Sequence, residues 1–104
     1  SHETSDDHDH EDFDSFVITL SGDQVEQTFL TRLSYAVEKH DILRIKGFIS
    51  IVDKPMRLAI QAVGTRIETY FDRYWPQGSE RHSKLVVIGK AGLEKDLISE
   101  ILIK

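Results

Sequence analysis

The chain of 104 residues has no cysteine, one methionine, one tryptophan and two prolines. Without cysteine it can form neither a disulfide bond nor a thiolate metal site, which fits a reducing compartment. No apolar run approaches the roughly 18 residues that span a membrane, and no basic segment followed by an apolar one indicates a secretory signal. The first residue is Ser rather than Met, so we expect a piece of a longer or processed protein. The length suits one domain with one core.

Lysine and arginine are missing from the first 15 residues, which hold seven of the 18 acids. The remaining 11 acids face all 13 Lys and Arg, so the body of the chain has a net charge of +2. A nucleic-acid-binding domain usually shows a clear basic footprint, and +2 is too small to provide one. We therefore expect no nucleic-acid partner and no membrane partner.

Residues 1–14 contain one aromatic and no aliphatic side chain. They cannot bury enough apolar surface to offset their loss of conformational entropy, so we expect a disordered, acidic, histidine-containing linker. Imidazole and carboxylate groups are ligands that borderline divalent metal ions accept, and the candidates are His2, His8, Asp9 and His10. Two interpretations remain open. Either these residues capture such a metal ion in an exchangeable way, or the linker is solvated and its histidines do nothing specific.

Hydrophobic periodicity predicts five strands and two helices in the rest of the chain. A strand over 15–20 comes first, and Ser21 with Gln24 then predicts a capping box for a helix that ends near Lys39 or His40. Strands are expected over 42–52, 56–63, 66–74 and 85–88, the last covered on both faces, and Leu93, Leu97, Ile98 and Ile101 mark a final helix. The order strand, helix, four strands, helix predicts an α+β two-layer sandwich, with a mostly antiparallel sheet and helices on one face.

Polar and aromatic side chains share one face of the predicted hairpin over 42–63. They are Arg44, Lys46, Phe48, Arg57 and Gln61. This set predicts a docking surface, because guanidinium groups pair well with carboxylates at interfaces and an apolar Phe48 needs cover. The alternative is the solvated polar side of a sheet that is covered on its other side.

No group of residues points to catalysis. Ser83 has no base at a spacing that would activate it, and a lone His82 is typical of a loop. The chain has no G-x-x-x-x-G-K-[ST] phosphate-binding loop. Trp75 is expected to anchor a loop by packing with Tyr70, Phe71 and Tyr74. We therefore expect a protein that is not an enzyme.

Four segments occur in the order found in a known family. They are RIKGF (44–48), QAVG (61–64), WP (75–76) and RHSKLVVIG (81–89). They resemble the patterns R-x-K-G-F, Q-x-V-G, W-P and R-x-S-x-L-V-x-I-G of the CobW C-terminal domain, and residues 14–16 resemble the end of the linker before it. The resemblance covers nearly the whole chain. It implies a domain over 15–104 preceded by the linker over 1–14.

The resemblance implies a place in cytoplasmic metal chaperones, linked to cobalt for cobalamin synthesis or to zinc. In that family an N-terminal P-loop GTPase domain with a cysteine-containing metal motif precedes this domain, and neither feature occurs here. We therefore expect a non-catalytic C-terminal domain. Its expected partners are the GTPase domain of the parent chain and a metalloprotein client. A stand-alone interaction or oligomerisation module with no metal role remains the alternative.

Overall fold

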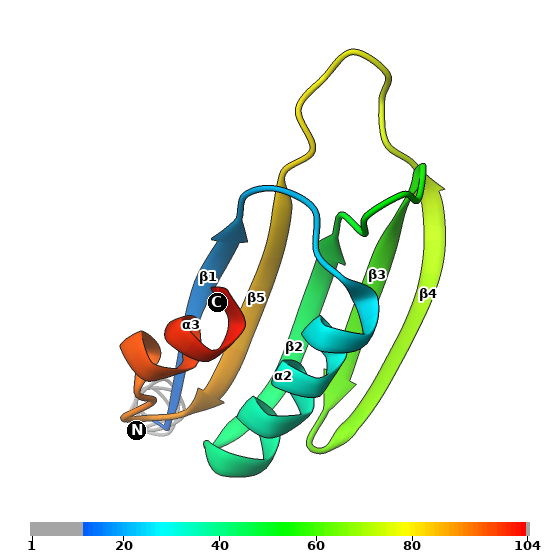
Figure 1. The fold of residues 1–104 in the computed structure, drawn as a ribbon. Helices are drawn as coiled ribbons and strands as arrows, with labels where there is room; N and C mark the ends of the chain where they lie inside the picture. The colour runs from blue at the N-terminus through cyan, green and yellow to red at the C-terminus, as the bar shows by residue number, and fades with distance from the viewer. Residues whose placement is uncertain (1–11, 104) are drawn as a thin grey trace, which may run out of the picture.

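The computed structural model describes residues 12–103 (Figure 1). Its elements are β1 (Phe13–Leu20), α2 (Glu26–Lys39), β2 (Ile42–Ile49), β3 (Met56–Val63), β4 (Arg66–Tyr74), β5 (Ser83–Lys90) and α3 (Lys95–Ile103). The order strand, helix, four strands, helix confirms the predicted α+β sandwich. No helix within residues 12–103 is long and apolar enough to cross a membrane.

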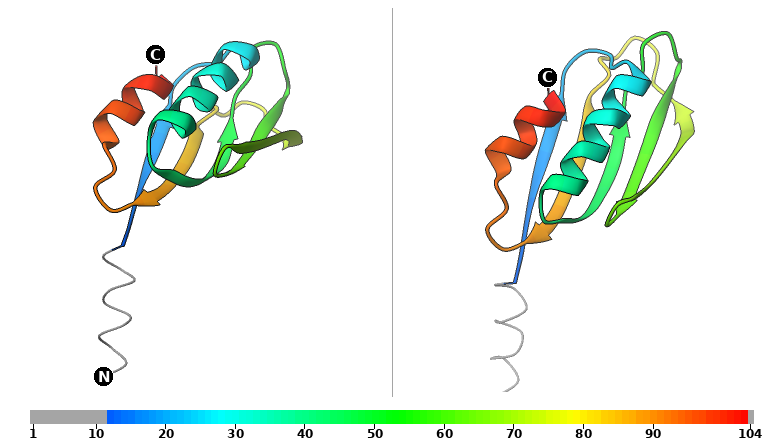
Figure 2. Two further views of the ribbon diagram at one scale, coloured as in Figure 1. Left: turned by 90° about the horizontal axis from the view of Figure 1, so that it is seen from below. Right: turned by 60° about the horizontal axis from the view of Figure 1, so that its bottom comes forward.

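The five strands form one sheet in the order β1-β5-β2-β3-β4, and each neighbouring pair is antiparallel. The sequence did not predict this order, because β5 inserts between two strands that precede it in the chain. Both helices lie on the same side of the sheet (Figure 2). Helix α2 packs on β2, α3 packs on β1, and the helices contact each other.

The core lies between the helices and the sheet. Its buried side chains come from alternating strand positions and from one face of each helix, as the periodicity predicted. They are Ile18, Leu20, Phe29, Leu33, Ala36, Val37, Ile42, Ile45, Ile49, Ile51, Leu58, Ile60, Ala62, Leu85, Val87, Ile98 and Leu102. Truncating a fully buried leucine such as Leu33 typically costs about 3 kcal/mol of unfolding free energy.

Helix α2 begins later than the capping-box prediction placed it. Val25 is the N-cap and makes no side-chain cap, so the predicted box of Ser21 and Gln24 is wrong. The backbone of Gln24 instead bonds to Ser50 and Val52, which holds it extended as an isolated parallel bridge. A long-range backbone pairing has here displaced a local helix signal. The helix ends as predicted, at Lys39 with His40 as C-cap.

Strand β5 is central, but only one of its faces is covered. Leu85 and Val87 are buried, whereas Lys84 and Val86 are exposed. The prediction that this strand is covered on both faces is therefore wrong. The reason is that both helices pack on one side, so an apolar run here does not mean two buried faces.

Gly47 allows β2 and β5 to come close together. A Cβ atom at this position would collide with the carbonyl oxygen of Lys84 and would lie 2.8 Å from the Cα of Leu85. A glycine inside a strand is typical of either a bulge or a close backbone approach. At Gly47 the structure has the close approach, whereas the irregularity in the β2–β5 register lies between Ile42 and Arg44.

The first strand begins at Phe13 rather than at Ser15. The carbonyl of Asp12 accepts a hydrogen bond from the N–H of Ala91, and the Asp14 carboxylate accepts one from the N–H of Gly92. These bonds tie the start of β1 to the turn after β5. The metal-ligand candidates His2, His8, Asp9 and His10 lie outside the described residues.

Candidate functional site

The face of the sheet opposite the helices is named here the open face. The strand register places Arg44, Lys46 and Phe48 of β2 along its centre. Opposite them lie Val63, Gln61 and Ala59 of β3, and Ile88, Val86 and Lys84 of β5. Ser15, Val17 and Thr19 of β1 and Arg66, Glu68 and Tyr70 of β4 continue the same three rows to the two edges.

All five residues of the predicted docking surface lie on the open face, but in two environments. Arg44, Lys46 and Gln61 are exposed, and Lys46 is directly opposite Gln61. Phe48 and Arg57 are half-buried near one end of the strands. The structure therefore brings the set together as a surface with an exposed centre and a packed end.

The exposed centre of the open face is basic. Arg44, Lys46 and Lys84 form no ion pair with any residue of the 12–103 range. The acid of the middle row, Glu68, lies 3.6 Å from Nε of Arg66 on the edge strand. Three cations on two adjacent central strands are thus left without a counter-charge inside the described part of the chain.

Apolar side chains accompany these cations. Val17, Val63 and Val86 are 51%, 59% and 37% exposed. A shallow hollow of about 460 Å³ is lined by Arg44, Lys46, Gln61, Val63, Val86 and Ile88 among others. Exposed apolar contacts rimmed by charge are typical of a surface that binds another chain.

Arg57 joins the exposed centre to the packed end. Its guanidinium makes hydrogen bonds of 3.0–3.2 Å to both carboxylate oxygens of Asp72, and its Cζ lies 4.0 Å above the ring of Phe48. The hydrogen bonds from Arg57 hold the pKa of Asp72 below its usual value of 3.8, although partial burial opposes them. The charge of Arg57 is therefore already satisfied by Asp72 within the chain.

Trp75 is the first residue after β4, and its side chain is buried at the base of the following loop. It is 9% exposed, and its ring meets that of Phe48 edge-to-face with centroids 5.9 Å apart. The predicted anchoring role fits this burial, but the predicted partners do not, because Tyr70 and Tyr74 are exposed. The guanidinium of Arg81 lies 6.0 Å from the Trp75 ring on the other side of the loop.

Two buried serines, Ser50 and Ser83, connect β2 and β5 at the end of the sheet where Trp75 lies. The N–H of Ser50 donates to Oγ of Ser83 at 2.8 Å, and Oγ of Ser50 donates to the Asp23 carboxylate at 2.6 Å. Arg81 donates to the carbonyl of Lys54 at 2.8 Å. Ser83 is fully buried and serves as an acceptor, so it is not an exposed nucleophile.

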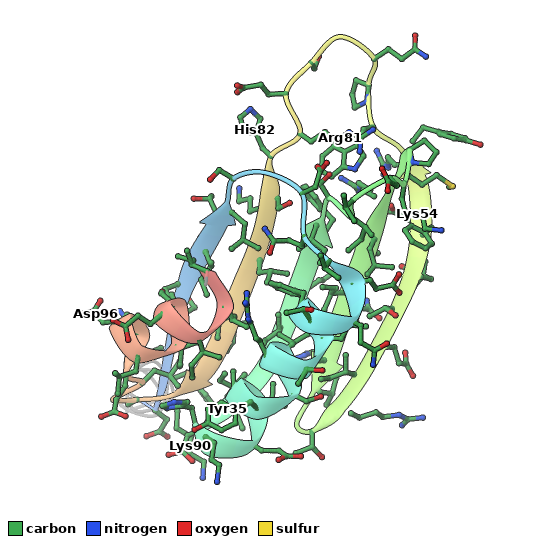
Figure 3. The ribbon with its side chains drawn as sticks, viewed as in Figure 1. Tyr35, Lys54, Arg81, His82, Lys90 and Asp96 are labelled. Carbon is green, nitrogen blue, oxygen red and sulfur yellow. The ribbon has the colours of Figure 1, made fainter. Side chains whose placement is uncertain are left out.

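Histidines of the described residues do not build a metal site. His82 lies 3.5 Å from Glu80, and both are exposed, while His40 lies 3.7 Å from Glu94 at the opposite end. No group of three or more His, Asp or Glu within residues 12–103 could hold a metal ion. Figure 3 shows Arg81 and His82 at the end with the projecting loop, and Tyr35 and Lys90 at the other.

Sequence reasoning missed Lys84, Val86, Ser50 and Asp23. Strand alternation in the 83–90 segment could have predicted that Lys84 and Val86 are exposed, because both lie between inward-facing positions. Strand alternation from Arg44, Lys46 and Phe48 predicts an outward position for Ser50. This prediction is wrong, because Ser50 is fully buried. Its partner Asp23 is 27 residues away, and nothing local connects the two.

The fold and this surface define a class: a small α+β sandwich in which both helices cover one sheet face and the other face carries exposed cations and valines. Residues 13–104 match the family model described as cobalamin synthesis protein cobW C-terminal domain. The chain belongs to this family.

Two curated relatives share its sequence closely. A protein of Sinorhizobium sp. named Zinc chaperone CobW is 50% identical over 88 residues, which cover 85% of this chain and 25% of the relative. A protein of the same name from Pseudomonas aeruginosa is 52% identical over 65 residues, covering 62% of this chain and 17% of the relative. The chain thus spans a quarter or less of the length of these relatives.

Solved structures share the fold. The Zn(II)-bound YjiA GTPase from E. coli matches with a TM-score of 0.76 and 24% identity, over 89% of this chain and 29% of that one. A Zn(II)-bound triple mutant of the YjiA GTPase matches with a TM-score of 0.77 and 25% identity, over 89% and 30%. Three of the four segments that carry the family resemblance meet around the end of β2, through Phe48, Trp75, Arg81 and Ser83. The fourth segment, 61–64, pairs with the first half of β2.

Proposed function

We propose that this chain is the C-terminal domain of a metal chaperone whose GTPase domain lies outside the present sequence. The observation that carries the proposal is the 50% identity to a protein named Zinc chaperone CobW over 85% of the chain. In this role the domain is non-catalytic and works in the cytoplasm. GTP binding and hydrolysis belong to the part of the parent protein that precedes it.

The open face is the surface by which the domain contacts the GTPase domain or a metalloprotein client. Arg44, Lys46 and Gln61 supply exposed polar contacts, and Val63 and Val86 supply apolar ones. At the packed end, Phe48 contacts both Arg57 and Trp75. These contacts hold the shape of the surface, and they add no free charge to it because Arg57 is paired with Asp72. Support comes from the three cations without a counter-charge among residues 12–103, because such groups gain most from a partner carboxylate.

Metal handling falls to the segment before the domain. His8, Asp9 and His10, with His2, are the ligands that Zn²⁺ or Co²⁺ would use, and the acidic residues that precede β1 act as the linker. Neutral imidazole is the ligating form, so affinity falls as the pH drops through about 6.5. Zinc is the metal named for the relatives, and cobalt is the one connected with cobalamin synthesis.

One titration tests the metal role. Zn²⁺ and Co²⁺ are added to the full chain and to a His2→Ala, His8→Ala, His10→Ala variant, with His40→Ala, His82→Ala as the matched control. Saturable binding that the first variant loses and the control keeps supports the proposal. Binding that only the control loses moves the site to the folded body, and no binding by any of the chains removes metal capture from this domain.

A second measurement tests docking. The part of the Sinorhizobium relative that this chain does not cover is supplied as a separate chain, and its affinity for this domain is measured. We expect binding that the Arg44→Glu, Lys46→Glu variant weakens by about tenfold or more. An Arg32→Glu, Lys39→Glu variant on the helix side is the control. Equal effects of the two variants would contradict docking through the open face.

A further inference from the structure

The open face carries positive charge that no residue of the 12–103 range neutralises, and an acidic segment precedes the strand at its edge. Arg44, Lys46 and Lys84 are exposed and form no ion pair within the described part of the chain. Residues 1–11 contain Glu3, Asp6, Asp7, Asp9 and Glu11 and no Lys or Arg. The two charge excesses are opposite in sign, and they belong to the same molecule.

The three cations form a compact target. Arg44 and Lys46 are two residues apart on β2, so their side chains leave the same face at a separation of about 7 Å. Lys84 lies opposite Phe48 on β5, which makes it the diagonal neighbour of Lys46. A stretch of closely spaced carboxylates could therefore contact all three at once.

The tether places the acidic segment within reach. Residue 11 adjoins Asp12, whose carbonyl is fixed by the N–H of Ala91, and the described part continues directly into the edge strand β1. Only β5 separates β1 from β2, so the lateral distance to Arg44 and Lys46 is about 10 Å. Eleven residues can span up to about 36 Å when extended. Because the acidic segment and the cations belong to one chain and are separated by few residues, the effective concentration of the segment at the open face is in the millimolar range. At that concentration a modest charge attraction is enough for the segment to bind.

We infer that the open face binds the acidic segment 1–11 of the same chain. The carboxylates contact Arg44, Lys46 and Lys84, and the contact is electrostatic, so it weakens with salt. This inference needs neither a metal nor a partner. Its regulatory consequence does rest on the proposed function: because the same face is the proposed docking surface, the segment competes with the GTPase domain or client for it.

The absence of cysteine makes a direct test available. A Ser5→Cys chain takes one nitroxide spin label, and paramagnetic relaxation is measured at side-chain methyl groups. We expect the strongest enhancement at Val86 and Val63 on the open face, and weaker enhancement at Leu33 and Leu102, which lie farther away in the helix-side core. Added salt should remove it.

Two variants and one mixing experiment decide the result. Arg44→Glu, Lys46→Glu, Lys84→Glu should lose the enhancement at Val86, while Arg32→Glu, Lys39→Glu should keep it. Enhancement confined to residues next to Phe13 would overturn the inference. So would enhancement of equal size from a spin-labelled chain mixed with an isotope-labelled one, because the segment would then bind a second copy. These samples contain no partner and no metal, so a negative result here leaves the proposed function to its own tests.

Discussion

The backbone N–H of Ser50 donates a 2.8 Å hydrogen bond to the side-chain oxygen of Ser83, and both residues are fully buried. Ser50 follows the end of β2 and Ser83 begins β5. The bond therefore ties two central strands together at the end of the sheet where the 75–82 loop leaves. A buried N–H without an acceptor is costly, which makes this one hydroxyl important.

Replacing Ser83 with Ala should lower the free energy of unfolding by about 2 kcal/mol, because the Ser50 N–H would stay buried with no acceptor. Ser15→Ala on the exposed part of β1 is the matched control and should change stability by less than about 0.5 kcal/mol. Urea unfolding of the three proteins measures both effects. Equal stabilities of the Ser83→Ala chain and the parent would show that the bond contributes nothing.

Gly47→Ala should be among the most damaging single substitutions. The added Cβ would overlap the Lys84 carbonyl, and both atoms belong to central strands that cannot move apart cheaply. We expect a loss of about 3 kcal/mol or more. Gly22→Ala meets no atom within 4 Å and strains only a φ of +77°, so about 1 kcal/mol is expected there. A thermal melt in which Gly22→Ala is the worse of the two would contradict this account.

Replacing Trp75 with a smaller aromatic residue should change the free energy of unfolding little. Its indole N–H is buried and has no acceptor among the described residues. Trp75→Phe removes that unsatisfied donor and keeps an aromatic ring against Phe48, so the change in unfolding free energy should stay within about 1 kcal/mol. Trp75→Ala, which removes the ring, should cost about 3 kcal/mol. Comparable losses for both variants would mean that the N–H does have a partner in solution.

The Arg57–Asp72 pair should make stability depend on pH in the acid range. Because the pKa of Asp72 is lowered on folding, the pair stabilises the fold above the usual pKa of 3.8 and loses that contribution as the pH falls through the lower folded value. At pH 7, Asp72→Asn should cost about 1 kcal/mol, since solvent screens a pair that is about one-fifth exposed.

The pH series also contains its own control. The stabilities of Asp72→Asn and the parent should converge in strong acid, where the parent carboxylate is also neutral. Glu68→Gln removes an acid from an exposed pair with Arg66 and should shift neither the stability nor its pH dependence measurably. A constant difference between parent and Asp72→Asn at every pH would point to lost packing instead of lost charge.

Much of the fold was predictable because it depends on local repetition. In α2 the periodicity predicts an apolar stripe of Val25, Phe29, Leu33, Ala36 and Val37, and the last four are buried as predicted. Val25 is wrong, because it is the N-cap and is exposed. The open face was also predictable in part, since Arg44, Lys46 and Gln61 lie at positions of one parity on adjacent strands. The start of α2 was not, because pairing of Gln24 with Ile51 overrode a capping signal.

The sequence by itself determined the elements, their order and the sign of charge along the chain, since each follows from neighbouring residues. Only the tertiary structure decided which strand lies beside which, and with it the nature of the open face. Insertion of β5 between β1 and β2 places Lys84 and Val86 next to Lys46, 38 and 40 residues away in the chain. It also brings Ser83 under Ser50. Such contacts depend on the packing of the whole sheet, because a strand's own pattern says which face is buried and not which neighbour it pairs with.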